Sequence, residues 1–402
     1  MAVNVKIGLI GAFDMLKFKN MAKKREKVIQ AAPAKDIVCD YKINANAKLL
    51  HPDRQVLVVK EIIDHPAAGA KTIVFGSADG SPVAFFRAGQ YLSLKLPING
   101  SFVTRPYSIS SSPKWALEGK YAVTVRRNPT GFAADWILEN LKPGDEVLAS
   151  APEGQFFYEN LRDCKNVVAL AGGSGITPFL SMAYAIRDGL EDFNLTIILG
   201  SNTEDVILFR EELDEICKAT DKVKVVHVLA NEEKEGFEHG FINADVIRKY
   251  AAEPYSIFIC GPEGMYRFVA GEVAKLDKPR REVRREMLGV TKKVWEQPGY
   301  PQESKGQTYQ LTVRQGALEQ TIPALADEPL LVAIERAGIK APSKCRSGEC
   351  GWCRSRLISG TVFVPQDNEY RRFSDVELGY VHPCCTFATG DCVLEVPGEY
   401  LG

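Results

Sequence analysis

Four cysteines near the end of the chain constrain its fold more than any other feature. Cys345, Cys350 and Cys353 have the spacing C-x4-C-x2-C, and Cys384 follows after thirty intervening residues. Thiolates with this spacing bind a [2Fe-2S] cluster, in which each iron needs two protein sulfurs. Structural zinc is the alternative, but zinc sites usually pair two C-x2-C units, and the gap of four residues does not fit. The sequence therefore predicts an iron–sulfur site with these four ligands, and Cys385 is a rival for the fourth position.

The composition predicts an ordinary multidomain globular protein. A length of 402 residues exceeds what one hydrophobic core usually supports, so two or three domains are expected. The 50 basic and 51 acidic residues leave a net charge of -1, which argues against binding to nucleic acid or to an anionic membrane. The cysteines outside the cluster motif are scattered among mostly apolar neighbours, as expected in a reducing compartment. No uncharged apolar run reaches about 18 residues and no signal peptide is recognised, so a cytoplasmic location is expected.

Residues 1–51 form an N-terminal extension to which the sequence assigns no role. An apolar run over residues 7–13 is followed by the basic residues Lys23, Lys24 and Arg25. This combination is typical of a helix that binds a membrane surface or a partner, and peripheral membrane contact by residues 1–30 is one interpretation. The alternative is a helix that packs on its own protein.

Residues 52–155 have the pattern of an antiparallel β-barrel. A helix is expected at residues 132–141, where the sequence Lys-Pro-Gly-Asp ends it. The expected strands are the β-rich runs 55–63, 71–75, 91–95, 121–126 and 146–149, which turn residues separate.

Residues 164–296 alternate between strand-like and helix-like segments, which predicts a doubly wound α/β domain with a parallel sheet. A charge run at residues 280–285 is expected to be a solvated surface. The expected strands are 167–171, 195–200, 223–229 and 256–260, and the expected helices are 178–188, 208–219 and 265–276.

Residues 297–307 are rich in Pro, Gly and Gln and are predicted to be a linker. The linker leads into a C-terminal domain at residues 308–402, which contains the cluster cysteines. Within it, segments 308–314 and 317–322 are expected to pair as a hairpin, followed by a helix at 330–337.

A glycine-rich turn in the α/β region has the features of a phosphate-binding loop. The strand at 167–171 runs into Gly172, Gly173 and Gly175, after which Thr177 and Pro178 begin a helix. Glycines let the pyrophosphate of a nicotinamide dinucleotide approach the exposed amides of such a turn. The alternative is a tight turn without a ligand.

The segment 380–391, which contains Cys384, resembles the closing strand of plant-type ferredoxins. Together with the three earlier cysteines, the resemblance extends over the C-terminal domain. It implies a β-grasp fold, one-electron transfer without bond-making, and Cys384 rather than Cys385 as the fourth ligand. Gly348 and Gly351 would let the backbone of the loop approach the cluster sulfurs.

The sequence Arg105-Pro106-Tyr107-Ser108 resembles the Arg-x-Tyr-Ser signature of the ferredoxin-NADP reductase superfamily. The resemblance implies that Tyr107 stacks on the isoalloxazine ring of a flavin, that Ser108 bonds the ring edge and that Arg105 holds phosphate. The bound cofactor is then a flavin nucleotide.

The superfamily makes a second phosphate contact with a Gly-x-x-Ser/Thr sequence at a helix start, where backbone amides favour an anion. The matching residues here are Gly131, Phe132, Ala133 and Ala134, so the hydroxyl side chain is missing. FAD is expected because most of the superfamily uses it. FMN stays open because relatives with a C-terminal ferredoxin domain include FMN enzymes.

The nicotinamide site also resembles that of the superfamily. The turn Gly-Gly-x-Gly-Ile-Thr-Pro matches its nucleotide fingerprint, and Cys260, Gly261 and Pro262 match its Cys-Gly-Pro motif beside the nicotinamide. Carboxylates in the sequence 204–205, after the strand at 195–200, would repel the 2′-phosphate of NADPH and accept ribose hydroxyls. NADH is therefore expected, and Arg210 keeps NADPH open.

Together, the motifs imply an NAD(P)H-dependent oxidoreductase that moves electrons from NADH through a flavin to its own [2Fe-2S] cluster and on to a protein acceptor. The acceptor is an oxygenase or an anaerobic redox enzyme such as a corrinoid protein. No catalytic side chain is predicted, because the cofactors carry the chemistry. A non-catalytic redox-sensing or assembly subunit is the alternative function.

Overall fold

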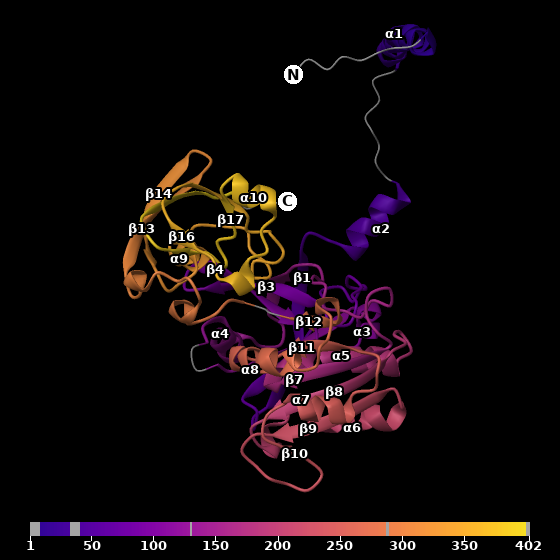
Figure 1. The fold of residues 1–402 in the computed structure, drawn as a ribbon, viewed down its shortest axis with the longest axis vertical. Helices are drawn as coiled ribbons and strands as arrows, with labels where there is room; N and C mark the ends of the chain where they lie inside the picture. Colours follow the sequence, from indigo (N-terminus) through magenta and orange to yellow (C-terminus); the bar gives the residue numbers. More distant parts are fainter. Residues whose placement is uncertain (1–8, 33–40, 129–130, 287–288, 399–402) are drawn as a thin grey trace. The chain divides into compact units, whose positions relative to one another are not determined.

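The computed structural model describes residues 9–32, 41–128, 131–286 and 289–398 (Figure 1). The chain divides into two compact units, Met1–Asn46 and Ala47–Gly402. The first unit contains helix α1 (Leu9–Ala31), whose described side chains are almost all exposed. Helix α2 (Lys42–Leu50) begins in this unit and buries no residue. No helix in the described ranges is long and apolar enough to cross a membrane.

The second unit begins with a six-stranded antiparallel sheet in the order β4-β3-β6-β1-β2-β5. An antiparallel bridge between Ile109 and Val123 joins its two edges, so the sheet closes into the expected barrel. The interior is filled by side chains such as Leu57, Phe75 and Leu94. The elements are β1 (Gln55–His65), β2 (Ala70–Ser77), β3 (Tyr91–Ile98), β4 (Ser101–Ser108), α3 (Lys114–Leu117), β5 (Lys120–Arg126), α4 (Ala133–Asn140) and β6 (Glu146–Ala149).

A parallel sheet in the order β10-β9-β8-β7-β11-β12 follows, and the predicted doubly wound fold is confirmed. Helices α5 and α6 pack on one face, and α7 and α8 pack on the other. The strand order reverses between β7 and β11, and doubly wound sheets bind ligands at the carboxyl ends of such strands. The elements are β7 (Asn166–Gly172), α5 (Thr177–Arg187), β8 (Asn194–Ser201), α6 (Arg210–Ala219), β9 (Val223–Leu229), β10 (Glu238–His239), α7 (Ala244–Tyr250), β11 (Tyr255–Cys260), α8 (Glu263–Ala274) and β12 (Val283–Arg285).

The expectation of a solvated charge run at residues 280–285 was wrong for Arg284, whereas Arg285 is exposed. Strand β12 pairs in parallel with β11 at the edge of the sheet. Arg284 donates a hydrogen bond of 2.6 Å to the carbonyl oxygen of Phe157 and lies 3.5 Å from the carboxylate of Asp163. These partners lie more than a hundred residues away in sequence, so local charge density could not reveal that the arginine is held inside the fold.

The segment predicted as a linker, residues 297–307, is packed rather than extended. The side chain of Tyr300 is buried together with Val294 and Phe387, and its hydroxyl donates to the carbonyl oxygen of Ala326 at 3.3 Å. Ser304 is buried as well. The C-terminal sheet is therefore joined to the preceding part through an ordered segment.

The C-terminal part has the expected β-grasp arrangement, in which helix α9 packs on a mixed sheet in the order β14-β13-β19-β15-β17. Strands β13 and β14 form the predicted hairpin, and β13 pairs in parallel with β19. The elements are β13 (Thr308–Gln315), β14 (Leu318–Leu325), α9 (Leu330–Arg336), β15 (Ser355–Ser359), β16 (Val362–Phe363), α10 (Phe373–Glu377), β17 (Tyr380–Val381), β18 (Phe387–Ala388) and β19 (Cys392–Glu395). Short 3₁₀ helices lie at Gly173–Ile176, Glu204–Val206, Arg280–Glu282, Val294–Glu296, Gln302–Ser304 and Gln366–Asn368.

Candidate functional site

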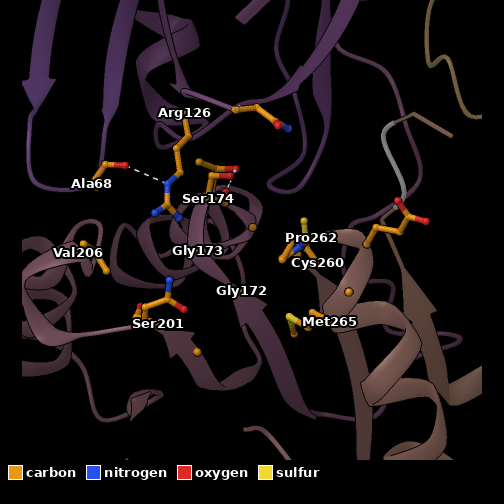
Figure 2. A pocket seen from close by; sticks show the side chains of 18 of the residues that line it. Ala68, Arg126, Gly172, Gly173, Ser174, Ser201, Val206, Cys260, Pro262 and Met265 are labelled. Atoms are coloured by element: carbon orange, nitrogen blue, oxygen red, sulfur yellow. Dashed lines mark hydrogen bonds between the residues drawn. The ribbon is translucent and has the colours of Figure 1, made fainter. Parts of the chain in front are cut away.

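A cavity of about 1330 Å³ lies between the barrel and the parallel sheet (Figure 2). Three sequence motifs meet in its wall, namely residues 106–108 of β4, residues 172–175 after β7 and residues 260–262 after β11. Residues 126–128 and 200–202, at the ends of β5 and β8, complete this part of the wall. The cavity therefore lies at the reversal of the strand order and faces the barrel strand that carries the Arg-x-Tyr-Ser motif.

The glycine turn fits a phosphate group because side chains are excluded from it. A Cβ atom on Gly172 would lie 2.5 Å from the sulfur of Met265, and Gly173 has a φ of +52°, a conformation that favours glycine. The turn leads directly into α5, and the hydroxyl of Thr177 donates to the carbonyl oxygen of Ser174 at 3.0 Å. Thr177 lines the cavity, whereas Pro178 is buried in the first turn of α5. A helix that starts with exposed amides is a good partner for an anion.

Arg126 is a cation at this turn that the sequence motifs did not indicate. Its Nε donates to the carbonyl oxygen of Ala68 at 2.9 Å, and Figure 2 shows its guanidinium pointing into the cavity between Ala68 and Ser174. A Cβ atom on Gly173 would lie 2.5 Å from its Nη1. The only sequence signal is its position as the last residue of β5, so three-dimensional proximity was needed to identify it.

Residues 260–262 lie directly beside the glycine turn in the cavity wall. Cys260 is buried at the end of β11, and burial raises the pKa of its thiol. Tyr266, on α8, accepts a hydrogen bond of 3.3 Å from the amide of Gly261 and donates to the carbonyl oxygen of Glu286. Pro262 precedes α8 and lines the cavity. Tyr266 therefore holds the ends of β11 and β12 together.

Glu286 is the second group that sequence reasoning missed. It follows β12, lines the cavity and is 5% exposed, and its Oε1 has no hydrogen-bond partner among the described residues. Burial raises the pKa of this carboxyl well above 4.5, the negative charge of Glu349 raises it further, and Arg284 opposes the shift. The unpartnered oxygen indicates a polar ligand in the cavity.

The Arg-x-Tyr-Ser motif divides between the cavity and the C-terminal part. Pro106, Tyr107 and Ser108 line the cavity, and burial raises the pKa of the Tyr107 hydroxyl. Arg105 lies outside this wall, where its Nη1 donates to the carbonyl oxygen of Thr104 at 2.9 Å. Burial, and repulsion from a neighbouring arginine, lower the pKa of the Arg105 guanidinium to about 10. The carboxylate of Glu335, 3.8 Å away on α9, opposes this lowering, and a phosphate would be a further partner for the partly exposed guanidinium.

The predicted second phosphate contact is not in the cavity wall. Residues 131–134 lead into α4, whose cap residue Phe132 makes no side-chain hydrogen bond, and α4 itself begins at Ala133. Asp135 lies in the first turn of α4, 3.2 Å from Arg127, and adds a negative charge there. Because Ala134 has no hydroxyl and Asp135 already occupies the nearby cation Arg127, this helix start favours phosphate less than the motif suggests.

The four predicted cluster ligands come together in the C-terminal part. Cys353, Cys384 and Cys385 pack together in the core, and the neighbouring thiols of Cys350 and Cys384 lower the pKa of the Cys345 thiol. Backbone amides point at two of these sulfurs, from Cys350 to Cys345 at 3.4 Å and from Trp352 to Cys350 at 3.5 Å. Within the described ranges, no three His, Cys, Asp or Glu side chains are arranged to hold a single metal ion. Four thiols with amide donors fit a cluster better than they fit an isolated ion.

The surroundings of Cys385 distinguish it from Cys384. Its thiol donates to the carbonyl oxygens of His382 at 3.4 Å and Asn368 at 3.7 Å. A Cβ atom on Gly348 would lie 2.6 Å from the Cys385 sulfur, so this side chain packs behind the loop. A thiolate ligand cannot donate such hydrogen bonds, and the geometry therefore favours Cys384 as the fourth ligand.

Comparison with protein families identifies three domains in this chain. The oxidoreductase FAD-binding domain matches residues 70–158, the oxidoreductase NAD-binding domain matches residues 169–271, and the 2Fe-2S iron-sulfur cluster binding domain matches residues 313–389. The chain is thus similar, in this order, to a flavin domain, a nucleotide domain and a ferredoxin.

Several characterised proteins are similar over most of the chain. The glycine betaine monooxygenase reductase subunit of Chromohalobacter salexigens is 26% identical over 363 residues, covering 86% of this chain and 95% of its own. The ferredoxin reductase component of 3-ketosteroid-9-alpha-monooxygenase from Mycobacterium tuberculosis is 29% identical over 352 residues, covering 84% and 94%. The solved structure of phthalate dioxygenase reductase matches with a TM-score of 0.61 and 23% identity, covering 86% of this chain and 98% of that one.

The chain belongs to the ferredoxin-NADP reductase superfamily of flavoproteins, and it carries a C-terminal [2Fe-2S] ferredoxin domain. More particularly, it is an NAD(P)H-dependent flavin and iron–sulfur reductase. Its cofactors are FAD, NADH and a [2Fe-2S] cluster. The predicted family and activity are confirmed, and the alternative of a non-catalytic subunit gains no support.

Proposed function

We propose that the cavity holds the flavin ring against the nicotinamide ring, and that the acceptor of the electrons is a separate oxygenase component. The observation that carries this proposal is the meeting of Tyr107 and Ser108, the glycine turn 172–175 and Cys260 in one cavity wall. The names of the relatives, which are reductase components of monooxygenase systems, support the class of acceptor. When bound, the flavin takes two electrons from NADH as a hydride, and the cluster carries them one at a time.

Three residues of β4 would hold the flavin. The buried phenol of Tyr107 stays neutral, so its ring can stack on the isoalloxazine. The hydroxyl of Ser108 lines the same wall and can bond the ring edge. Arg105 supplies positive charge for the phosphate, since the first turn of α4 contains Asp135 and is poorly suited to that role.

The glycine turn and Arg126 would hold the pyrophosphate of the nicotinamide dinucleotide. The turn offers amides at the start of α5, and Arg126 places its guanidinium beside Gly173. Across the cavity, Glu286 keeps its carboxyl proton over a wider pH range than an exposed glutamate does. The unpartnered Oε1 of Glu286 can then exchange a hydrogen bond or a proton with the bound rings.

The far end of the cavity favours NADH over NADPH. The wall there contains Ser201 and Val206, and Glu204 lies between them in sequence. The carboxylate of Glu204 forms ion pairs with both Arg210 and Lys234. Both cations are therefore engaged by a carboxylate, and a 2′-phosphate would have to displace it.

Anaerobic mixing with NADH tests the proposed function. The flavin absorbance band should bleach first, and the electron paramagnetic resonance (EPR) signal of the reduced cluster should follow. Tyr107→Ala should lose flavin during purification because the stacking surface is gone, whereas Tyr107→Phe should retain it. Bleaching without a cluster signal, or normal flavin content in Tyr107→Ala, would contradict the proposal.

Peripheral membrane contact by residues 1–30 stays a prediction. Exposed Phe13, Leu16 and Phe18 lie in the first half of α1, and Lys23, Lys24 and Arg25 lie in the second half. Lys19 also lies in the first half, and exposed Val28 and Ile29 lie in the second, so apolar and basic side chains are mixed along the helix, whereas a helix that lies flat on a membrane has them on opposite faces. Sedimentation of the full chain with phosphatidylserine vesicles, against phosphatidylcholine vesicles, measures this contact.

A further inference from the structure

The two residues that flank the cluster ligand Cys345 each lead by ion pairs to the barrel. Lys344, on one side, pairs directly with Glu153, which follows β6. Arg346, on the other side, has its Nη1 2.6 Å from Oε1 of Glu335 on α9. The second oxygen of Glu335 lies 3.8 Å from Nη1 of Arg105 on β4. Two connections therefore run between the barrel and the loop of Cys345. We call the pair Lys344–Glu153 the direct link and the chain Arg346–Glu335–Arg105 the relayed link.

The Glu335–Arg346 pair is buried, and the other two pairs are partly shielded from solvent. The side chains of Glu335 and Arg346 are each 7% exposed, and those of Lys344 and Glu153 are 18% and 20% exposed. Surface ion pairs contribute little to stability, but removing one partner of a buried pair leaves an uncompensated charge and is strongly unfavourable. The relative position of the loop and the barrel therefore depends on these pairs.

The relayed link has two further supports. The hydroxyl of Ser101, at the start of β4, donates to the main-chain carbonyl oxygen of Glu335 at 2.7 Å. Arg346 has a φ of +59°, a left-handed conformation that non-glycine residues rarely adopt. Such backbone strain persists where surrounding interactions hold the residue in place, and the pair with Glu335 is such an interaction.

The direct link ends beside the flavin motif as well. The amide of Tyr91 donates to the carbonyl oxygen of Glu153, and the amide of Glu153 donates to that of Tyr91, both at 2.9 Å. Tyr91 is the first residue of β3 and lies opposite Ser108 in the register of β3 and β4. Glu153 is therefore tied to the strand that pairs with the flavin strand.

We propose that Glu335 and the Lys344–Glu153 pair are positioning residues that fix the cluster loop against β3 and β4 for electron transfer within the chain. The inference rests on the proposed function, which places the flavin at Tyr107 and Ser108. Each NADH supplies two electrons, which cross this contact singly, and each crossing reduces one ferric ion of the cluster to ferrous. The acceptor reoxidises the cluster between the two crossings.

The test uses the holoenzyme and separates its two steps by anaerobic stopped-flow absorbance. Glu335→Gln and Lys344→Met should leave the rate of flavin bleaching by NADH within about twofold of the parent. Each should slow the later reduction of the cluster by about tenfold or more, because a small displacement of reacting groups has a large effect on rate. Glu335→Asp, which restores the charge, should recover part of the loss.

Glu319→Gln is the matched control, since Glu319 pairs with Arg314 at 2.6 Å within the hairpin of the ferredoxin domain and reaches neither the barrel nor the loop. Hydrogen–deuterium exchange provides a readout other than activity. Segments 101–108 and 341–353 should exchange faster in Glu335→Gln, and not in Glu319→Gln. If Glu335→Gln or Lys344→Met lowers the iron and sulfide content, Glu153→Gln serves as a second test. It breaks the direct link by a substitution in the barrel and leaves the sequence of the ferredoxin domain unchanged.

Parental cluster reduction in Glu335→Gln, Lys344→Met and Glu153→Gln, each with full cluster content, would overturn the inference. A wild-type protein whose flavin is not bleached by NADH would overturn the proposed function instead. The two failures are therefore distinguishable in one series of measurements.

Discussion

A Cβ atom added to Gly175 would lie 2.2 Å from the carbonyl oxygen of Cys260. The glycine turn after β7 and the end of β11 thus touch backbone to backbone, at the point where the strand order of the sheet reverses. This close approach brings the two halves of the nucleotide site together, and it explains why the turn tolerates no side chain at this position.

Gly175→Ala is therefore expected to push the turn away from Cys260. Forcing an atom into this contact should lower the free energy of unfolding by about 1–3 kcal/mol and raise the KM for NADH, because the amides of the turn move. Gly271→Ala is the control, since it lies exposed in α8 with nothing within 4 Å of the added atom. The control should stabilise the protein by about 0.5–1 kcal/mol. Steady-state kinetics with an unchanged KM in Gly175→Ala would contradict this role of the turn.

Cys384→Ser and Cys385→Ser should behave oppositely although the residues are adjacent. Cys384 is buried against Cys353 and is the proposed fourth ligand, so its loss should abolish cluster absorbance and leave NADH-driven bleaching of the flavin intact. Cys385 donates to two carbonyl oxygens, a role that a serine hydroxyl can take over, and its variant should keep the cluster. Iron and sulfide analysis decides between them, and a cluster that survives in Cys384→Ser would refute the ligand assignment.

Glu204→Gln should shift the coenzyme preference toward NADPH. The substitution leaves Arg210 and Lys234 without their carboxylate partner, and hydrogen bonds to charged groups contribute about 1.5–3 kcal/mol, so kcat/KM for NADPH relative to NADH should rise about tenfold or more. Glu211→Gln, on the exposed face of α6, is the control and should leave the ratio unchanged. A ratio that does not move in Glu204→Gln would show that these cations do not reach the nucleotide.

Glu286→Gln should become more stable than the parent as the pH rises. Burial raises the pKa of the Glu286 carboxyl well above 4.5, so the folded protein holds a proton that the unfolded chain releases. Unfolding is therefore increasingly favoured as the pH rises from 4.5 toward the raised pKa, and the neutral glutamine avoids this loss. Thermal unfolding of both proteins between about pH 5 and about pH 8 measures the difference. A difference that does not grow with pH would mean that Glu286 ionises normally.

The sequence predicted those parts of the site whose functional residues lie close together in the chain. The loop with Cys345, Cys350 and Cys353, the glycine turn and residues 105–108 each combine several chemically specific residues within a few positions. The sequence also predicted the strands and helices around these motifs, because apolar runs of strand length alternate regularly with helical segments.

The parts that the sequence could not predict depend on pairs of distant residues. Lys344 and Glu153 are separated by 191 positions, and Arg284 meets the carbonyl oxygen of Phe157 across 127 positions. Arg126 and Glu286 gain their significance from the cavity that folding creates around them. The polar composition of residues 297–307 predicted a linker, but the ring of Tyr300 within this segment is buried.

Among the four cysteines of the cluster loop and its closing strand, Cys350 is exposed and Cys345, Cys353 and Cys384 are buried. Cys350 is therefore the proposed ligand that a reagent from solution, whether a chelator, dioxygen or a redox protein, would meet first. A docked acceptor that covers Cys350 would protect the iron from chemical attack while it draws electrons from it.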